Sequence, residues 1–299
     1  MRIDTAPSIL FVVDGPHARS APHNDNFTRL PDLFRQHQWE VAVCEDESLS
    51  VDSEGVHIAG LELNAFDVVW VLGFGLQSRY LDRVQILSSA QQVRFVSNPL
   101  QQMHLHGKAA WVTWSPKSVC SSDPLILKHH MARAPSPTGQ WVLKPNAGSL
   151  GRGVNVVSSV NELTQLLEQV DQGTWILEPY KDMQKGELRT LIAGGEVLGS
   201  YLRRAAPGTL HNLSQDGQAE AYSPSTDEML LVKQIHEHLI RKGIGFAAID
   251  TVDGALMEVN VVNPGGLATM EDLYGTAWYV QAGAKLAGAI NALIDQALP

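Results

Sequence analysis

Cysteines, long apolar runs and blocks of like charge are all scarce in this sequence. Of its 299 residues only Cys44 and Cys120 are cysteines, with no CxxC pattern and no metal-ligand spacing, so we interpret both as reduced thiols. No segment approaches the roughly 20 apolar residues of a membrane span. The start of the chain lacks the charged and then apolar pattern of a signal peptide. We therefore predict a cytoplasmic protein with no membrane partner.

Several catalytic signatures are absent too. There is no GxSxG motif and no convincing Cys–His pair, which argues against a hydrolase. No GxGxxG follows the first expected strand, and no glycine-rich stretch ends in GKS or GKT, so neither a dinucleotide fingerprint nor a P-loop is present. The formal net charge of -10, without a basic stripe, argues against a nucleic-acid partner.

The first hundred residues alternate between strand and helix patterns. Short apolar runs predict four strands, at 9–13, 39–44, 66–72 and 93–96. Residues 26–38 carry apolar side chains at helical spacing. Apolar strands separated by helices are typical of a parallel sheet that is covered on both faces. We predict an α/β protein that begins with a small Rossmann-like domain over residues 1–105.

From about residue 105 strands become more frequent, and the pattern acquires an α+β character. A chain of 299 residues is long enough for two or three domains. The strands expected here are 117–120, 141–144, 154–157, 175–177, 188–192, 196–202, 246–251 and 255–261. The helices expected here are 105–114, 123–131, 161–169, 228–241 and 276–294. A second, mixed region is therefore expected after the Rossmann-like one.

Two acids and an amide near the C-terminus form the most informative group. Glu258 and Asn260 are two residues apart on an expected strand, so they share one face. Asp250 joins them if the hairpin loop before them has three residues, 252–254, with Gly254 in the left-handed region, and we predict this loop. A two-residue loop would turn Glu258 to the other face. Three oxygen ligands on one face suit Mg²⁺ bound to nucleotide phosphates; the alternative is a solvated face or an acid paired with arginine.

A glycine-rich loop follows an apolar strand that ends in a lysine. Lys144 lies at the strand edge, and Gly148, Gly151 and Gly153 follow within nine residues. Closely spaced glycines let a backbone approach a ligand and offer N–H groups to phosphate. A lid over a nucleotide fits this pattern, and a plain glycine-rich hairpin is the alternative.

The segment Glu178-Pro179-Tyr180 ends another expected strand. In isolation it is a turn. If it borders a nucleotide, Pro179 has no N–H to offer, so a backbone donor to the base must come from Tyr180 or Lys181.

Polar residues in and after the central strands add three weaker signals. Arg189 and Arg204 would neutralise the charge of a transferring phosphate if they lie near the acids. The turn 263–266, which follows the acid–amide strand, has backbone amides suited to a carboxylate at the start of the next helix. Surface salt bridges and a structural turn are the respective alternatives.

Taken together, these segments resemble the ATP-grasp superfamily and specifically bacterial glutathione synthetase, most strongly over residues 143–267. The stretches around Lys108 and Lys144 look like the family's two ATP lysine segments. The stretch around Arg189 resembles the strand that carries its phosphate-binding arginine, and residues 204–212 resemble its Arg…Asn stretch. The family's metal ligands fall on Asp250, Glu258 and Asn260.

The resemblance implies an ATP-grasp domain of two lobes, 106–182 and 183–299, after the Rossmann-like domain. It implies ATP and Mg²⁺ as cofactors, with Mn²⁺ as an alternative ion. The implied activity is a carboxylate–amine ligase that forms an amide through an acylphosphate, with a small acid or peptide and an amine as partners. Lys108 and Lys144 would hold the α and β phosphates, and the loop 148–153 would close over the reaction and exclude water.

The expected site residues form four groups. The catalytic group is Arg189, Arg204 and Asn212. The nucleotide-binding group is Lys108, Lys144, Gly148, Gly151, Gly153, Glu178 and Tyr180. The metal group is Asp250, Glu258 and Asn260. The substrate group is Asn263, Gly265 and Gly266.

Departures from the glutathione synthetase pattern fall on the substrate side. Residues 71–76 stand where the family carries Arg-x-Asp-Pro-Pro, and they contain neither charge nor proline. His211 replaces the arginine of an Arg-Gly-Asn stretch, and residues 263–265 replace a Ser-Pro-Thr turn. A true glutathione synthetase, using γ-glutamylcysteine and glycine, is therefore the alternative within this class, and a non-catalytic nucleotide-binding module the alternative outside it. A homo-oligomer is also expected from the resemblance.

Overall fold

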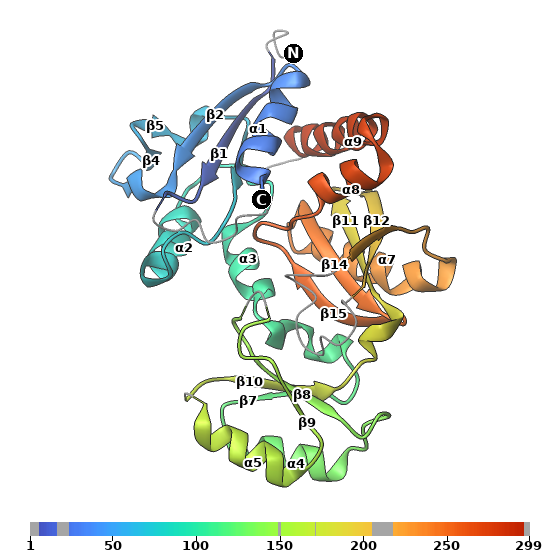
Figure 1. Ribbon diagram of the computed structural model, residues 1–299. Coiled ribbons are helices and arrows are strands. Elements are labelled where there is room, and N and C mark those ends of the chain that lie inside the picture. The colour runs from blue at the N-terminus through green and yellow to red at the C-terminus, as the bar shows by residue number, and fades with distance from the viewer. Residues whose placement is uncertain (1–5, 17–23, 149–150, 171, 205–217, 296–299) are drawn as a thin grey trace.

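Three main sheets organise the chain: a parallel sheet near the N-terminus and two antiparallel sheets after it (Figure 1). The computed structural model describes residues 6–16, 24–148, 151–170, 172–204 and 218–295. The mixture of helices with parallel and antiparallel strands confirms the predicted fold class. No helix in the described ranges is long and apolar enough to cross a membrane.

The N-terminal part is built on a parallel sheet in the order β2-β1-β6. Its strands are β1 (Ser8–Val13), β2 (Glu40–Glu45) and β6 (Val68–Val71). Its helices are α1 (Asn26–Gln36), α2 (Tyr80–Ser88) and α3 (Pro99–His106). The unbroken apolar run of β1 is buried, as a central parallel strand requires. Residues 93–96, expected as a fourth strand, contribute only a bridge between Phe95 and Val69.

A small antiparallel sheet next to β2 was not anticipated. It consists of β3 (Leu49–Val51), β4 (Val56–Ile58) and β5 (Leu61–Glu62). These strands have two or three residues each, too short for an alternating pattern to stand out in the sequence.

The middle of the chain forms a lobe around an antiparallel sheet in the order β7-β10-β8-β9. Its strands are β7 (Val119–Ser121), β8 (Trp141–Pro145), β9 (Asn155–Val157) and β10 (Trp175–Pro179). Helices α4 (Pro124–Arg133) and α5 (Val160–Gln169) cover one face. The lobe has an apolar core of its own, which includes Leu143, Leu163 and Leu177. We call this part the N-lobe.

The last part of the chain, which we call the C-lobe, carries a five-stranded antiparallel sheet in the order β13-β12-β11-β14-β15. Its strands are β11 (Glu187–Ala193), β12 (Glu196–Arg204), β13 (Gln218–Ala221), β14 (Phe246–Val252) and β15 (Ala255–Asn260). Its helices are α7 (Thr226–Arg241), α8 (Leu267–Tyr274) and α9 (Thr276–Ile294).

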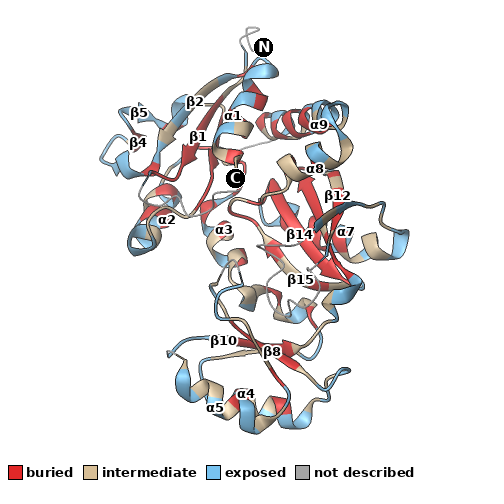
Figure 2. Ribbon diagram, in the orientation of Figure 1, coloured by how far each residue is buried: buried red, intermediate tan, exposed pale blue. Residues whose placement is uncertain are grey.

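The N-terminal sheet and the C-lobe share one apolar core (Figure 2). The ring of Trp70 on β6 packs edge-on against Phe246 on β14, with centroids 5.3 Å apart. Leu286 and Ile290 of α9 join the same cluster. These two parts therefore form one body, whereas the N-lobe packs around a separate core. The domain limits expected at residues 105 and 182 stay predictions.

Candidate active site

The hairpin of β14 and β15 brings its two acids together by a route other than the expected one. Asp253 (φ 51°) and Gly254 (φ 72°) form a two-residue turn, so the predicted three-residue loop is wrong. A register shift then leaves Met257 as an extra residue on β15 and pairs Asp250 with Glu258. Directly opposed residues project from the same face, so the expected juxtaposition of the acids is nevertheless present.

Asp250 is the fully buried centre of a charged network. Arg189 donates to both of its oxygens, from Nε at 2.8 Å and from Nη2 at 2.6 Å. Nη2 of Arg203 lies 3.0 Å from Oδ2, and the side-chain amide of Asn260 donates to that oxygen at 3.1 Å. Burial alone would raise the pKa of Asp250, but the two guanidinium groups outweigh it and hold the pKa below its usual range. The carboxylate therefore stays ionised.

Asp250 is paired with arginine, the alternative named for this acid, and the face also carries oxygen donors of the kind that suit Mg²⁺. Carboxylate and amide oxygens are ligands that Mg²⁺ prefers. Since the Asn260 nitrogen faces Asp250, its Oδ1 is left as an acceptor. The Nζ of Lys108 lies 3.1 Å from Oε1 of Glu258, so a cation already sits beside this carboxylate. The described residues contain no cluster of three or more acidic, histidine or cysteine side chains suited to a metal, so a site here depends on Asn260 and on phosphate oxygens.

Arg203 is a site residue that the sequence interpretation missed. It lies on β12 opposite Glu187, on the face that also carries Arg189 and Asp250. Its Nη2 is 2.8 Å from Oε2 of Glu187, and burial raises the pKa of Glu187 to about 7. The alternation of side chains along a strand was the signal available: every second residue of β12 faces the acids.

Arg204, the expected catalytic arginine, points away from this face. Its Nε pairs with Glu220 at 2.9 Å, and both side chains are about half exposed. The structure gives it no contact with Asp250, so its role stays a prediction from the resemblance. Asn212 lies outside the described residues.

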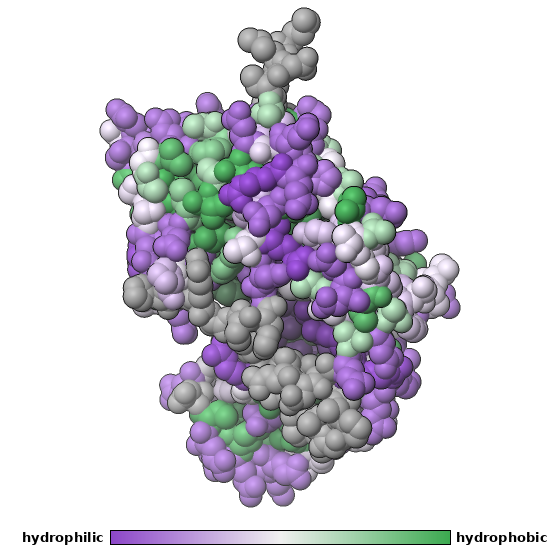
Figure 3. Space-filling view, turned by 45° about the horizontal axis from the view of Figure 1, so that its top comes forward, coloured by the Kyte–Doolittle hydropathy of each residue, from purple (hydrophilic) through white to green (hydrophobic). Residues whose placement is uncertain are grey.

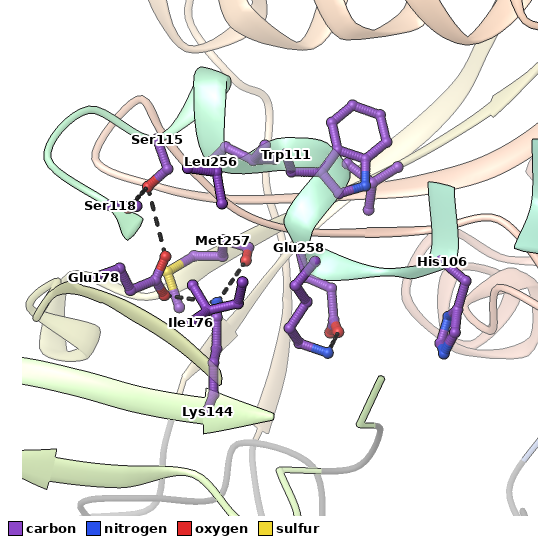
Figure 4. Close-up of a pocket in the computed structure, with 13 residues that line it drawn as sticks. His106, Trp111, Ser115, Ser118, Lys144, Ile176, Glu178, Leu256, Met257 and Glu258 are labelled. Atoms are coloured by element: carbon purple, nitrogen blue, oxygen red, sulfur yellow. Dashed lines mark hydrogen bonds and ion pairs between the residues drawn. The ribbon is translucent and has the colours of Figure 1, made fainter. Parts of the chain in front are cut away.

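The N-lobe contributes a second buried carboxylate, Glu178 on β10 (Figure 4). Its Oε1 accepts from Lys144 Nζ at 2.6 Å, and Lys181 Nζ lies 3.3 Å from Oε2. Burial would raise the pKa of Glu178, but the ammonium group of Lys144, followed by that of Lys181, holds it below its usual range. Lys144 also reaches the carbonyl of Met257, the extra residue on β15, at 3.4 Å. The bulge that aligns the acids thus also meets the N-lobe.

The expected nucleotide loop faces the same hairpin. Lys108, at the start of a 3₁₀ helix (Lys108–Trp114), donates to the carbonyl of Gly148 at 2.5 Å. Gly151 (φ 68°) and Gly153 (φ 73°) have left-handed conformations that disfavour other residues. Lys108 therefore bridges the glycine-rich loop and Glu258.

A pocket lies between the lobes. Its lining includes His106, Lys108, Ser115, Lys144, Glu178, Leu256 and Glu258. In the space-filling view, hydrophilic residues gather around the hollow between the N-lobe and the rest of the molecule (Figure 3). The N–H of Tyr180 donates to the carbonyl of Gln140 at 2.9 Å, so of the two expected backbone donors to a base, that of Lys181 is the one left.

The remaining expected residues lie just after β15. Arg189 Nη1 donates to the carbonyl of Gly265 at 3.3 Å, which brings the expected substrate turn next to the Asp250 network. Gly266 has a φ of 140°, open to glycine but strained for other residues. The turn and the acids therefore border one site.

Residues 71–76, at the end of β6, belong to a separate polar network that includes Asp14 and Arg83. The N–H groups of Phe74 and Gly75 donate to the Asp14 carboxylate, and Arg83 Nη1 donates to the carbonyl of Gly73. Asp14 and Arg83 are both buried, with Oδ1 and Nη1 3.6 Å apart. The charges at this end of the sheet are thus engaged within the protein.

Lys108 lies beside Glu258 and Lys144 beside the carbonyl of Met257, so two lysines meet the acid-bearing hairpin at a pocket between two antiparallel sheets, as in an ATP-grasp enzyme. The model of the prokaryotic glutathione synthetase ATP-grasp domain matches residues 109–275. The glutathione synthetase of Parasynechococcus marenigrum is 30% identical over 220 residues, 71% of each chain. That of Prochlorococcus marinus subsp. pastoris is 28% identical over 293 residues, 88% of this chain and 94% of its own.

Solved structures share the fold over almost the whole chain. D-cycloserine synthetase DcsG has a TM-score of 0.68 at 17% identity, covering 93% of this chain and 99% of that one. The ATP-grasp ligase PsnB has a TM-score of 0.67 at 14% identity, covering 96% and 99%. The chain belongs to the prokaryotic glutathione synthetase family of ATP-grasp proteins. It is an ADP-forming carbon–nitrogen ligase that joins a carboxylate to an amine, and its family uses ATP and Mg²⁺.

Proposed function

We propose that this ligase activates its acid substrate as an acylphosphate and that the acid differs from γ-glutamylcysteine. The observation that carries the mechanism is the 3.1 Å approach of Lys108, next to the glycine-rich loop, to Glu258 on the C-lobe hairpin. A phosphate-binding cation and a metal-binding acid meet there at the mouth of one pocket. That is the place where a γ-phosphate would be transferred.

In the proposed reaction, a carboxylate oxygen of the acid attacks the γ-phosphorus of ATP, and the bond to the β-phosphate oxygen breaks to release ADP. The amine nitrogen then attacks the acyl carbon, phosphate leaves, and the amine loses a proton. Lys108 and Lys144 hold the phosphates, while Arg189 and Arg203 lie beside Asp250, where they offset negative charge. Bound Mg²⁺ would supply further charge neutralisation, held by Asp250, Glu258 and Asn260, and Mn²⁺ would suit the same oxygen donors.

The acid is proposed to contact the turn 263–266, through Asn263 and the backbone of Gly265 and Gly266. The end of β6 supports a departure from glutathione chemistry, because the charges of Asp14 and Arg83 are engaged internally. One solved PsnB structure contains a minimal precursor, Mg and ADP, and a D-alanyl-alanine synthetase from Vibrio cholerae shares the fold at a TM-score of 0.60 and 14% identity. Amino acids and short peptides are therefore the first acids to test.

The test is ADP release across a panel of amino acids and short peptides paired with amines, with mass spectrometry of the products. The panel includes γ-glutamylcysteine with glycine. A second arm replaces the amine by hydroxylamine, which traps an acylphosphate as a hydroxamate. We expect an amide and a hydroxamate from the same acid. ADP release with an amide but without a hydroxamate would remove the acylphosphate step, and preferred turnover of γ-glutamylcysteine would make the protein a true glutathione synthetase.

A further inference from the structure

The start of helix α1 contacts the candidate substrate turn, although the two are far apart in the sequence. The side-chain nitrogen of Asn26 donates to Oδ1 of Asn263 and to the carbonyl of Pro264, both at 2.9 Å, across 237 and 238 residues. The side-chain nitrogen of Asn24 donates to the carbonyl of Asn263 at 2.8 Å. Asn26 is 1% exposed. A carbonyl oxygen only accepts, so these contacts fix which way both amide groups face.

These contacts hold three consecutive carbonyls of the turn. Asn24 holds that of Asn263, Asn26 holds that of Pro264, and Arg189 holds that of Gly265. A trans peptide unit is planar, with its N–H opposite its C=O. The N–H groups of Gly265 and Gly266 therefore point away from Asn26 and Arg189. Fixing each carbonyl thus fixes the direction of the amide in the same peptide plane.

Asn26 contributes little to its own helix. Asparagine favours the position before a helix, where it caps a free N–H, and is a poor residue inside one. Here Asn26 is the first helical residue, and its side chain is turned outward to the turn. The preceding residue, Asp25, makes no capping bond and instead pairs with Arg29, whose other end pairs with Glu271 on α8. The side-chain amides of Asn24 and Asn26 thus reach the C-lobe, while Asn24 Oδ1 accepts from the N–H of Asn26 at the helix start.

We propose that Asn26, supported by Asn24, is a positioning residue that holds the turn 263–266 so that its amides face the carboxylate of the substrate. This inference rests on the proposed function, in which that turn contacts the acid. It makes the substrate side of the site depend on the N-terminal domain, while the nucleotide side depends on the N-lobe. Asn26 acts through the turn and does not touch the substrate.

Asn26→Asp tests this proposal because it keeps the size of the side chain, removes both donors and sets an anion against two acceptor oxygens. Ser97→Ala is the matched control. Ser97 is also buried, and its Oγ accepts from the N–H of Gly245, so it joins the same two parts of the molecule away from the turn. Asn24→Ala is the second variant, used if Asn26→Asp does not fold. It removes the bond to the carbonyl of Asn263 and the bond that Asn24 Oδ1 accepts from the N–H of Asn26.

In the kinetic arm, we expect Asn26→Asp to raise the KM for the acid by about tenfold and that for ATP by no more than about twofold, with a smaller shift of the same kind in Asn24→Ala. Ser97→Ala is expected to leave the ratio of the two KM values unchanged. Equal changes in both KM values for Asn26→Asp, or the same ratio in Ser97→Ala, would overturn the positioning role.

In the second arm, hydrogen exchange is followed in the free protein over residues 263–270. Met270 N–H donates to the carbonyl of Gly266 in the first turn of α8, so it reports whether the turn is held. Exchange there is expected to be about tenfold faster in Asn26→Asp than in Ser97→Ala. Equal exchange rates would overturn the proposal. This arm needs no turnover, so it still decides the role of Asn26 if no acid and amine are joined and the proposed function fails.

Discussion

Two buried carboxylates, one in each half of the cleft, are held by different cations. Asp250 on the C-lobe is paired with the guanidinium groups of Arg189 and Arg203. Arg189 donates to both of its oxygens, at 2.8 Å and 2.6 Å. Glu178 on the N-lobe is held by two ammonium groups, one at 2.6 Å and one at 3.3 Å. A planar guanidinium fixes the orientation of a carboxylate, whereas an ammonium group on a flexible stem is a point charge that can move. The proposed metal face is therefore held rigidly, and the proposed nucleotide end is held by cations that can adjust their positions.

The apolar cores of the C-lobe and the N-lobe also differ: the first is shared with another part of the molecule and the second is not. The C-lobe packs against the N-terminal sheet through Trp70 and Phe246, and α9 belongs to the same cluster. The N-lobe packs around a separate cluster that includes Leu143 and Leu177. The body has a large shared core, and the N-lobe has a smaller core of its own. This arrangement suits a site in which the body stays fixed while the N-lobe opens and closes over it.

The largest expected effect follows from Asp250→Ala. The substitution leaves the largely buried Arg189 without its anion and Arg203 with Glu187 alone, which costs about 3 kcal/mol of unfolding free energy. It also removes a proposed metal ligand, so ligase activity should fall on the order of a hundredfold or more. Urea unfolding and ADP release measure the two effects. Glu220→Ala, which breaks an exposed pair, is the control, and a loss of similar size there would contradict the buried network as the cause.

Truncations in the two cores test whether the body and the N-lobe unfold separately. Phe246→Ala should cost about 3–5 kcal/mol and Leu143→Ala about 2–5 kcal/mol. In calorimetry, Phe246→Ala is expected to lower the transition of the body, and Leu143→Ala that of the N-lobe. Bound ATP should raise the N-lobe transition of the wild type. A single transition that both variants shift equally would show that the body and the N-lobe unfold as one cooperative unit.

The stability of the body and the stability of the N-lobe should change in opposite directions as the pH falls. Glu187, in the body, has a pKa raised to about 7, so its proton favours the folded state; the stabilisation is complete below its ordinary pKa of 4.5 and is lost as the pH rises through about 7. The unfolding free energy of the body should therefore decrease as the pH rises from 4.5 to 7.5. Glu178 has a lowered pKa and stabilises the N-lobe above pH 4.5, an effect that is lost as the pH falls further.

Glu187→Gln separates this cause from other titrating groups. The variant keeps a hydrogen-bonding side chain opposite Arg203 and cannot titrate. Urea midpoints at pH 5.0 and pH 7.5 should differ less in the variant than in the wild type. The same difference in both proteins would mean that Glu187 does not set the pH dependence.

Local patterns predicted much of this architecture. The apolar run of residues 9–13 is the central parallel strand β1, and helix 26–38 is observed as α1 with a slightly earlier end. The shared face of Asp250 and Glu258 was predicted too, but for the wrong reason. Met257 is ordinary in a strand, so nothing in the sequence marked the bulge that restores the register.

Contacts between distant segments could not be predicted in this way. Periodicity places Arg203 and Arg204 on opposite faces of β12, but which face meets Asp250 depends on the order of the strands in the sheet. Asn26 is an unremarkable helix residue in the sequence, and its partner Pro264 is 238 residues away. Such residues become visible only when the N-terminal domain is docked on the C-lobe.

The smallest expected effect concerns the turn that precedes the bulge. Gly254 has a φ of 72°, and a Cβ added there would meet nothing within 4 Å, so Gly254→Ala introduces backbone strain without a clash. We expect a loss of about 1 kcal/mol in unfolding free energy and unchanged magnesium-dependent activity, because the register of Asp250 and Glu258 is set by the bulge at Met257. Urea unfolding and the Mg²⁺ concentration for half-maximal ADP release measure both. A large rise in that Mg²⁺ concentration would show that the turn, and not the bulge, aligns the acids. The alignment of Asp250 with Glu258 would then depend on the two exposed turn residues, Asp253 and Gly254.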